Sequence, residues 1–451
     1  MRRDLPWRDP WAVAVALADA FGREGMVWLD GENPDQGEEE REARPGGDDL
    51  SRHGLLAVEP LESVCCRGLP GQNGASDPFA TLERLEAGGG TWLGWLNYEA
   101  GAWVEPGDHW QTPAMATLWA GRYDPLLHVD RRERQLWLEG DDAQRLEAVA
   151  AVVEALPAGE GPAPLAEAPP IPITAWQWHT GAARFAAQVE RIQDWITAGD
   201  LFQANLSACC ECERAEAPDP LALYGRLRRA CPAPFSALAI ASGEARGEAV
   251  LSASPERFLQ VRETGQVETR PIKGTRPRQA DPDADALEAA ALISSPKDRA
   301  ENVMIVDLLR NDLGRVCVPG SIDVPQLVGL ESYRQVHHLT SVVEGQLRSE
   351  CSVVELLRAC WPGGSITGAP KVRACRRLNE VEPVARGPYC GSLFRLGPGR
   401  SFDSNILIRS VLVKDRSLRV HAGCGIVADS DPAREGEEMG WKIKPLLEAL
   451  A

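Results

Sequence analysis

The chain has 451 residues, of which 44% are hydrophobic and 25% are charged, as in folded globular proteins rather than disordered ones. Its 48 Lys and Arg against 66 Asp and Glu give a formal net charge of −18, which argues against partners such as nucleic acid or anionic lipid. No stretch approaches the roughly 20 apolar residues of a membrane span, so we expect a cytoplasmic protein.

The first third of the chain mixes helical and strand patterns. Residues 11–21 form an amphipathic pattern that predicts a helix, and strand-like runs follow at 55–58, 92–98 and 135–139. A second helix is predicted at 143–156. This N-terminal part therefore contains enough apolar sequence to fold, together with segments that do not resemble a packed core.

Two such segments divide the chain. Residues 31–49 hold eight acidic side chains, two Arg, two Pro and four Gly, a composition that predicts a solvated loop. Residues 157–172 contain six prolines and two glycines and predict an extended linker. We therefore expect an N-terminal region at 1–156 and a larger domain at 173–451.

The C-terminal part shows helices and short strands in irregular order. Helical patterns cover 180–198, 280–293, 296–313, 353–359, 371–380 and 432–450. Strand patterns cover 200–213, 235–241, 257–261, 266–269, 401–413 and 417–423. Because strands and helices do not alternate strictly, the order favours an α+β fold with largely antiparallel sheets over a doubly wound parallel fold.

Two segments of the C-terminal part place a reactive group beside a rigid backbone. In Ser252–Phe258, Glu256 follows a proline at the start of a predicted strand, where a carboxyl group could act as a general acid. In Arg270–Pro277, Lys273 is held close to a proline and a glycine, as suits an amine nucleophile. Taken alone, each side chain is more typical of a solvated surface position.

Two helices carry carboxylates that could hold a hard cation. Glu301 shares one helix face with the apolar Ile305 and Leu308, so its charge needs a partner. Glu438 lies one turn before Lys442 on the last helix, which alternatively predicts a simple salt bridge. Because no Cys or His accompanies these carboxylates at ligand spacing, Mg²⁺ is favoured over Zn²⁺.

Taken together and in order, these segments resemble the chorismate-utilising enzyme family, which includes anthranilate, isochorismate and salicylate synthases and component I of aminodeoxychorismate synthase. The matching motifs are SPERF, PIKGTRPR, DRAENVMIVDLLRNDLGR, QVHHLTS, GSITGAPKVRA, RGPYCGS, ILIRS and HAGCGIVADSDP. They cover 175–451 densely, and a weaker match lies at 92–99. The resemblance implies an α+β fold of two largely antiparallel sheets packed as a sandwich, with flanking helices and the active site between the sheets.

Within this family, the position of Lys273 separates members. Anthranilate and salicylate synthases typically read PIAGT or PLAGT, whereas this chain reads PIKGT, as in aminodeoxychorismate synthase component I. This implies amination of chorismate at C4 to 4-amino-4-deoxychorismate, which leads to p-aminobenzoate and folate. Lys273 would attack C2, and Glu256 would protonate the leaving C4 hydroxyl. Anthranilate synthase component I is the alternative.

The resemblance also implies the other site residues. Glu301, Glu435 and Glu438 would hold Mg²⁺, and His338 would be the active-site histidine. Contacts to chorismate are expected from Gln203, Ser365, Thr367, Tyr389, Arg409, Gly423, Gly425 and Lys442. Gln203 stands where water-using relatives carry a lysine base, which favours ammonia over water as the incoming nucleophile.

Two further expectations concern partners, and one concerns the function. No glutaminase triad accompanies the motifs, so ammonia would come from a separate glutamine amidotransferase subunit or from free ammonium. The family's LDS segment, near which relatives bind tryptophan, reads Leu29-Asp30-Gly31 here, which leaves tryptophan binding near Asp30, Pro232 and Phe235 open. A non-catalytic chorismate-binding regulator of the same fold is a third hypothesis, disfavoured because the reactive residues are all present.

Overall fold

The computed structural model describes residues 1–31, 53–158, 169–333 and 336–451. The predicted acidic loop at 31–49 lies outside the described residues except for its first position, and so does most of the predicted linker at 157–172.

Most helices of the described residues begin after a residue whose side chain caps the first turn. The helices are α1 (Pro10–Phe21), α2 (Pro78–Gly88), α3 (Ala143–Glu154), α4 (Ala182–Thr197), α5 (Pro220–Ala230), α6 (Pro282–Ile293), α7 (Pro296–Gly314), α8 (Val353–Cys360), α9 (Lys371–Val381) and α10 (Pro432–Leu450). Five of them start at an Asp–Pro pair and α7 at Ser–Pro, with the cap side chain accepting an N–H of the first turn. Proline is favourable there because its missing N–H would have had no partner in the helix.

The strands of the described residues form two sheets, and every pairing between them is antiparallel. The first sheet has the order β1 (Arg2–Leu5), β8 (Gln135–Glu139), β7 (Leu126–Asp130), β3 (His53–Ala57), β2 (Val27–Leu29), β11 (Phe235–Ile240), β12 (Glu248–Ser254), β21 (Ser410–Lys414), β22 (Ser417–Ile426), β10 (Gln203–Glu213) and β18 (Gly368–Ala369), with β9 (Gln177–Trp178) also paired to β10. The second has the order β15 (Ile272–Pro277), β17 (Val336–Gln346), β14 (Gln266–Arg270), β13 (Arg257–Val261), β20 (Phe402–Asn405), β19 (Ser392–Leu396), β5 (Thr91–Leu96), β6 (Leu118–Tyr123) and β4 (Glu62–Cys66), with β16 (Asp323–Ser332) also paired to β17. The predicted α+β class with largely antiparallel sheets is confirmed.

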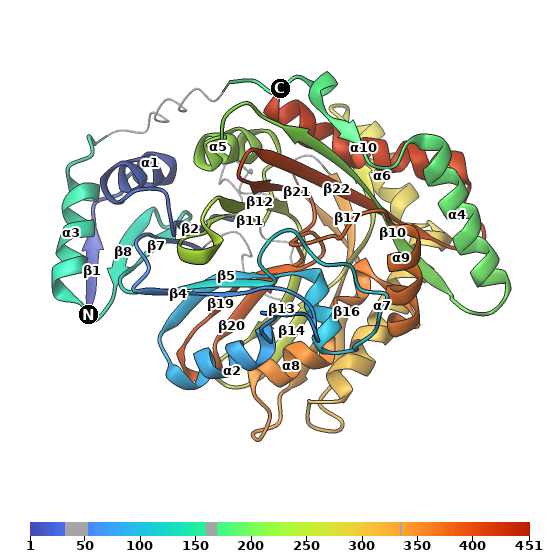
Figure 1. Ribbon diagram of the computed structural model, residues 1–451, viewed down its shortest axis with the longest axis horizontal. Coiled ribbons are helices and arrows are strands. Elements are labelled where there is room, and N and C mark those ends of the chain that lie inside the picture. The colour runs from blue at the N-terminus through green and yellow to red at the C-terminus, as the bar shows by residue number, and fades with distance from the viewer. Residues whose placement is uncertain (32–52, 159–168, 334–335) are drawn as a thin grey trace.

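The two sheets pack face to face, and helices cover their outer faces (Figure 1). On β11, Ala237 and Ala239 face the space between the sheets, whereas Leu238 and Ile240 face the helices. This period of two lets one strand serve two apolar layers. Helices α4, α5 and α10 cover the first sheet, while α2 and α8 lie against the second sheet (Figure 1).

Strands from before and after the predicted linker lie side by side in both sheets. In the first sheet β2 pairs with β11, and in the second β5 pairs with β19. The division at 157–172 remains a prediction, but the segments on its two sides share their hydrogen-bonded layers.

One predicted strand is wrong, and several elements were not predicted, among them helices α2 and α5 and the hairpin of β16 and β17. The run 401–413 is two strands, because β20 belongs to the second sheet and β21 to the first, and Arg409 between them has a φ of +49°. The chain therefore crosses between the sheets within this run. The hairpin of β16 and β17 was missed because Pro325 and Gly329 interrupt the strand pattern of β16.

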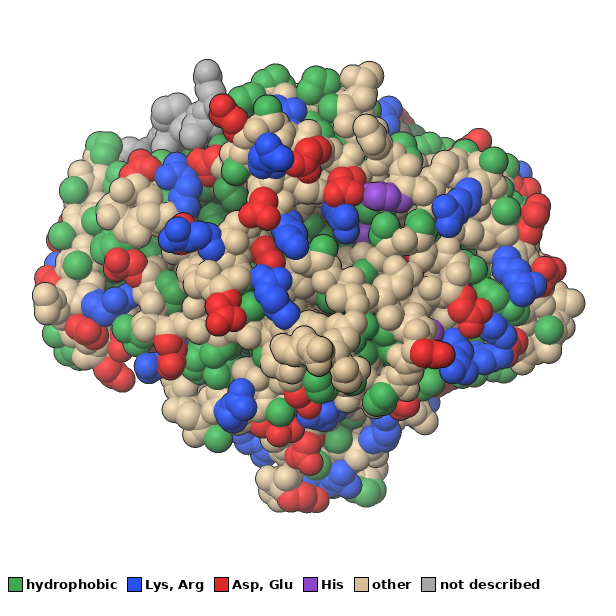
Figure 2. All heavy atoms as spheres, in the orientation of Figure 1, with side chains coloured by type: hydrophobic (Ala, Val, Ile, Leu, Met, Phe, Trp, Pro, Cys, Tyr) green, Lys and Arg blue, Asp and Glu red, His purple; other side chains and the backbone are tan. Residues whose placement is uncertain are grey.

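The charged side chains on the face shown in Figure 2 are interspersed, with acidic and basic groups lying close to one another. No helix within the described ranges has the length and apolar character needed to cross a membrane.

The close contact between β5 and β6 at Gly94 predicts how one added methyl group affects the stability of the fold. A Cβ at Gly94 would lie 2.0 Å from the carbonyl oxygen of Trp119 and 2.6 Å from the Cα of Ala120. We expect Gly94→Ala to lower the free energy of unfolding by about 1–3 kcal/mol because backbone atoms must move apart. Denaturant-induced unfolding measures this change.

Gly88→Ala is the matched control, because a Cβ on this last residue of α2 meets nothing within 4 Å. Its unfolding free energy should stay the same or rise slightly. Equal stability of the two variants would contradict the close strand contact.

Candidate active site

Glu256 and Ser365 meet in the interior between the sheets. Glu256 lies between the end of β12 and the start of β13 and is 4% exposed, and its backbone carbonyl accepts the N–H of Ile406 at 3.0 Å. Burial raises the pKa of Glu256 to about 7, although a hydrogen bond with Ser365 and the charge of Lys273 oppose the shift. A carboxyl group that titrates near neutral pH can give up a proton and take it back, as a general acid must.

Lys273 lies on β15, where its charge acts on three carboxylates. These are Glu256, Glu301 and Glu438, which come from three separate elements. The next residue, Gly274, allows β15 to approach α7 closely, since a Cβ there would lie 3.0 Å from an α7 side-chain atom. The structure thus places the predicted nucleophile among the predicted acid and metal ligands.

A mixed cluster of ligand atoms lies between α10 and β22. Single ligand atoms of Cys424, Glu435 and Glu438 lie within 4.8 Å of one another. Lys442 Nζ lies 2.8 Å from Glu438, and Lys297 Nζ lies 3.3 Å from Glu435. The salt bridge considered as the alternative for Glu438 and Lys442 is therefore present. The premise that no cysteine accompanies these carboxylates is wrong, because Cys424 is brought in by the strand.

Glu301 approaches this cluster from α7. Its Oε2 lies 3.2 Å from the position of a Cβ on Gly425. Burial raises its pKa, with the charges of Lys273 and Lys297 opposing the shift and that of Glu435 adding to it. The three predicted metal carboxylates thus face one region, and their oxygens are the hard donors that suit Mg²⁺. In the described part of the chain, Glu301 does not share the 4.8 Å spacing of the other two.

The two predicted glycines of β22 leave space that side chains of β10 approach. A Cβ on Gly425 would lie 2.5 Å from Gln203 Nε2, and one on Gly423 would lie 2.7 Å from Asn205 Nδ2. Gln203 is 1% exposed, and its Oε1 has no hydrogen-bond partner among the described residues. Larger residues on β22 would fill this space, so the glycines keep polar groups and strand backbone accessible to a ligand.

Arg409 lies close enough to His338 for its charge to act on the buried ring. The ring of His338 is 1% exposed, and its Nδ1 pairs with the Thr275 hydroxyl at 2.9 Å, while Nε2 has no partner among residues of known placement. Burial and the nearby charge of Arg409 lower the pKa of His338 to about 3, so the ring is neutral. No hydrogen bond or ion pair from the described residues reaches the Arg409 guanidinium. A cation without a counter-charge is suited to a carboxylate ligand.

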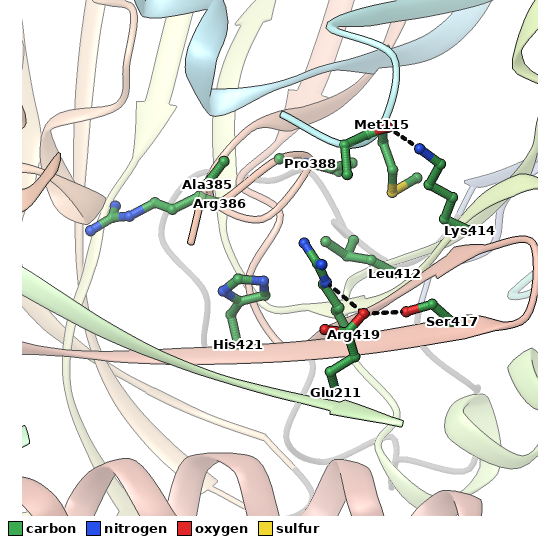
Figure 3. Close-up of a pocket in the computed structure, with 12 residues that line it drawn as sticks. Met115, Glu211, Ala385, Arg386, Pro388, Leu412, Lys414, Ser417, Arg419 and His421 are labelled. Atoms are coloured by element: carbon green, nitrogen blue, oxygen red, sulfur yellow. Dashed lines mark hydrogen bonds and ion pairs between the residues drawn. The ribbon is translucent and has the colours of Figure 1, made fainter. Parts of the chain in front are cut away.

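Two more of the predicted contact residues, Tyr389 and Thr367, already have partners within the protein. Tyr389 is 2% exposed and stacks on His421, with ring centroids 4.9 Å apart. The Thr367 hydroxyl donates to the Gly363 carbonyl at 2.8 Å, so it closes its own turn. A cavity of about 230 Å³ is lined by His421 and by the loop before Tyr389, as Figure 3 shows. None of the predicted site residues lines that cavity.

The residues considered for tryptophan binding lie elsewhere in the fold. Asp30 is fully buried, and its carboxylate is already bound by cationic and hydroxyl groups. Its partners are Arg131, Arg228 and Tyr224. Phe235 begins β11 and, like Pro232, is partly exposed. Tryptophan binding remains a prediction.

Comparison with known proteins decides the family. Residues 59–448 match the family model described as chorismate binding enzyme. The chain belongs to this family. It is thus a chorismate-utilising enzyme, as the motifs indicated.

Individual relatives and solved structures show which members of the family this chain is similar to. Aminodeoxychorismate synthase component 1 of Klebsiella aerogenes is 44% identical over 345 residues, which are 75% of this chain and 71% of that one. The protein of the same name from Salmonella typhimurium is 45% identical over 61% of this chain and 60% of its own length. Anthranilate synthase component I from Streptococcus pneumoniae superposes with a TM-score of 0.72 at 28% identity, over 91% of this chain and 95% of that one.

Three neighbours of the predicted residues were not anticipated. Lys297 pairs with Glu435, and its place four residues before Glu301 on one helix face was an available signal. Thr275, which orients His338, follows Lys273 by two residues, so the strand period puts both on one face. Cys424 had no such signal, because only the packing of β22 on α10 brings its sulfur near the carboxylates.

The space at Gly425 predicts a loss of ligand affinity on substitution. In Gly425→Ala the new methyl group would displace Gln203 and Glu301 from their positions. We expect chorismate to bind about tenfold or more weakly, the loss that a misplaced contact typically causes. Isothermal titration calorimetry measures the affinity.

Gly440→Ala on α10 is the control, because a Cβ there meets nothing within 4 Å. It should bind chorismate as the unsubstituted enzyme does. Unchanged affinity in Gly425→Ala would show that chorismate does not use this space.

Proposed function

We propose that this enzyme aminates chorismate at C4 with ammonia and gives 4-amino-4-deoxychorismate, a precursor of p-aminobenzoate and folate. The observation that carries the proposal is Lys273, an amine within the electrostatic reach of the buried Glu256. An amine nucleophile and a neighbouring acid are what two successive displacements on the ring require. The relatives named aminodeoxychorismate synthase component 1 support the same assignment.

The proposed reaction has two displacements. The neutral amine of Lys273 adds to C2, the two ring double bonds shift, and the C4–O bond breaks, with Glu256 supplying the proton that lets the hydroxyl leave as water. Ammonia then adds to C4, the double bonds shift back, and the bond from C2 to Lys273 breaks. The amine is regenerated, and the carboxylate of Glu256 takes up a proton released from the incoming nitrogen.

The surrounding residues supply binding and orientation. Arg409 and Lys442 offer cationic groups to the two carboxylates of chorismate, together with N–H groups of the Gly423–Gly425 backbone. His338, held neutral and oriented by Thr275, presents Nε2 without adding charge. Gln203 stands by the glycines as a neutral group and cannot serve as the base that would activate water.

We further propose that Glu301, Glu435 and Glu438 hold Mg²⁺ against the ring carboxylate. When bound, the ion would withdraw charge from the ring and so ease the displacement. Lys297 and Lys442 neutralise part of the carboxylate charge in its absence. A glutamine amidotransferase subunit is proposed as the source of ammonia, in keeping with the designation component 1 of the relatives.

Product identification tests this function. Purified chain supplied with chorismate, Mg²⁺ and an ammonium salt should form 4-amino-4-deoxychorismate, detected by chromatography and mass spectrometry. Lys273→Ala should lose this product by about 100-fold or more, because the covalent route is removed. Glutamine should replace ammonium only when an amidotransferase subunit is added.

Two outcomes would contradict the proposal. Direct formation of anthranilate by the unsubstituted chain would favour the alternative, anthranilate synthase component I. Full turnover by Lys273→Ala would remove this residue from the mechanism.

The raised pKa of Glu256 predicts a pH dependence. A general acid must carry its proton, and the protonated fraction falls as pH rises through its pKa of about 7. We therefore expect kcat/KM at a fixed concentration of free NH₃ to fall tenfold per pH unit above about 7. Glu256→Gln should reduce kcat by about 10²–10⁴-fold. An alkaline limb that is unchanged in Glu256→Asp, with kcat unaffected, would assign the proton to another group.

A further inference from the structure

The loop before Tyr389 is held by a buried carboxylate from a distant part of the sequence. Glu99, in a short 3₁₀ helix at Tyr98–Trp103, is fully buried. Its Oε1 accepts the N–H of Arg386 at 2.7 Å, and its Oε2 accepts the N–H of Gly387 at 3.0 Å. Both N–H groups lie within three residues of Tyr389. Glu99 thus fixes the backbone from which the tyrosine projects.

The side chain of Arg386 connects this loop by hydrogen bonds to two other parts of the site. In Figure 3 it points away from the other side chains that line the cavity. Its Nη1 donates to the Ile366 carbonyl at 2.8 Å, and its Nη2 donates to the Asn205 carbonyl at 2.7 Å. Ile366 lies between Ser365 and Thr367, and Asn205 lies on β10. One buried guanidinium therefore joins the Ser365 turn to the strand that carries Gln203.

A second carboxylate completes the network. Glu382 accepts two hydrogen bonds from Arg386, at 2.8 and 2.7 Å, and one from the Ser207 N–H at 2.9 Å. Ser207 is paired in register with Gly423 of β22. The hydrogen bonds thus connect the loop held by Glu99, through Arg386 and Glu382, to β10, the strand that pairs with the glycine strand β22. The guanidinium also lies 4.6 Å from the centre of the Tyr98 ring.

Stability alone is a weak reason for such a network. Buried ion pairs contribute little net free energy, because the loss of hydration offsets their attraction. What a fully bonded network does supply is a single arrangement of the groups it joins. Here those groups belong to three elements that carry predicted chorismate contacts.

We propose that Glu99 and Arg386 are positioning residues of the chorismate site. Together they hold the Tyr389 loop, the Ser365 turn and β10 in one arrangement before substrate binds. Neither side chain belongs to the predicted set of chorismate contacts. The inference uses the proposed function only in taking chorismate as the substrate.

The test compares two variants that disturb the contact between Glu99 and the loop before Tyr389. Glu99→Gln replaces an accepting oxygen by an NH₂ group that faces an N–H donor. Gly387→Ala leaves Glu99 intact and strains only the loop, because Gly387 has a φ of +62° and a Cβ there meets nothing within 4 Å. For both we expect the KM for chorismate to rise about tenfold or more with a smaller change in kcat, as when an oriented binding contact is lost.

Each variant has a structural control. Glu248→Gln changes another buried glutamate, which accepts the Ala116 N–H at 2.8 Å and pairs with Arg67. Gly320→Ala places a methyl group at a φ of +81°, also with nothing within 4 Å. Both controls should lower the melting temperature as much as their partners do and leave KM for chorismate within about twofold.

Equal effects on KM in each variant and its control, or no effect in either variant, would overturn the proposal. Should Glu99→Gln fail to fold, Gly387→Ala decides the question alone. KM is followed as chorismate consumption, so a product other than 4-amino-4-deoxychorismate would refute the proposed function and still leave this comparison decisive.

Discussion

The pairing of β10 with β22 is the constraint on which the geometry of the candidate site depends. Its register sets Ser207 opposite Gly423 and Asn205 opposite Gly425, so the side chains of one strand approach the bare backbone of the other. Helix α10 packs on β22 and brings the acidic residues to the same edge. A shift of one residue in this register would turn Gln203 to the opposite face and leave the glycines without neighbours.

The negative charge of this acidic protein lies mainly outside the region that carries the candidate site for an anionic substrate. Residues 1–174 carry a net charge of −17 and residues 175–451 only −1. Within the second region, the charges of Lys273 and Lys442 act on carboxylates of α7 and α10, whereas Arg409 has no carboxylate partner among the described residues. The negative charge thus resides mainly outside the site, where it does not oppose the approach of a dicarboxylate.

Sequence reasoning succeeded where the signal was local and failed where it was not. Motif residues such as Glu256 and Lys273 were found because their neighbours in sequence restrict them, although the Asp–Pro pairs at the starts of α2 and α5 were not used and those two helices were missed. The contact of Glu99 with the Arg386 loop spans 287 residues, and no local pattern encodes it. The run 401–413 was misjudged because apolar residues lie on both sides of Arg409, where the backbone leaves one sheet for the other.

The shared sheets also bear on how the chain is made. Strand β5 needs β19, and β2 needs β11, so apolar strands near the beginning must wait for partners that are synthesised hundreds of residues later. Contacts so far apart in sequence slow folding and expose strand edges in the meantime. The nascent protein is therefore most prone to aggregation before residue 396 has left the ribosome. Two halves that folded independently would have avoided this exposure of unpaired strands.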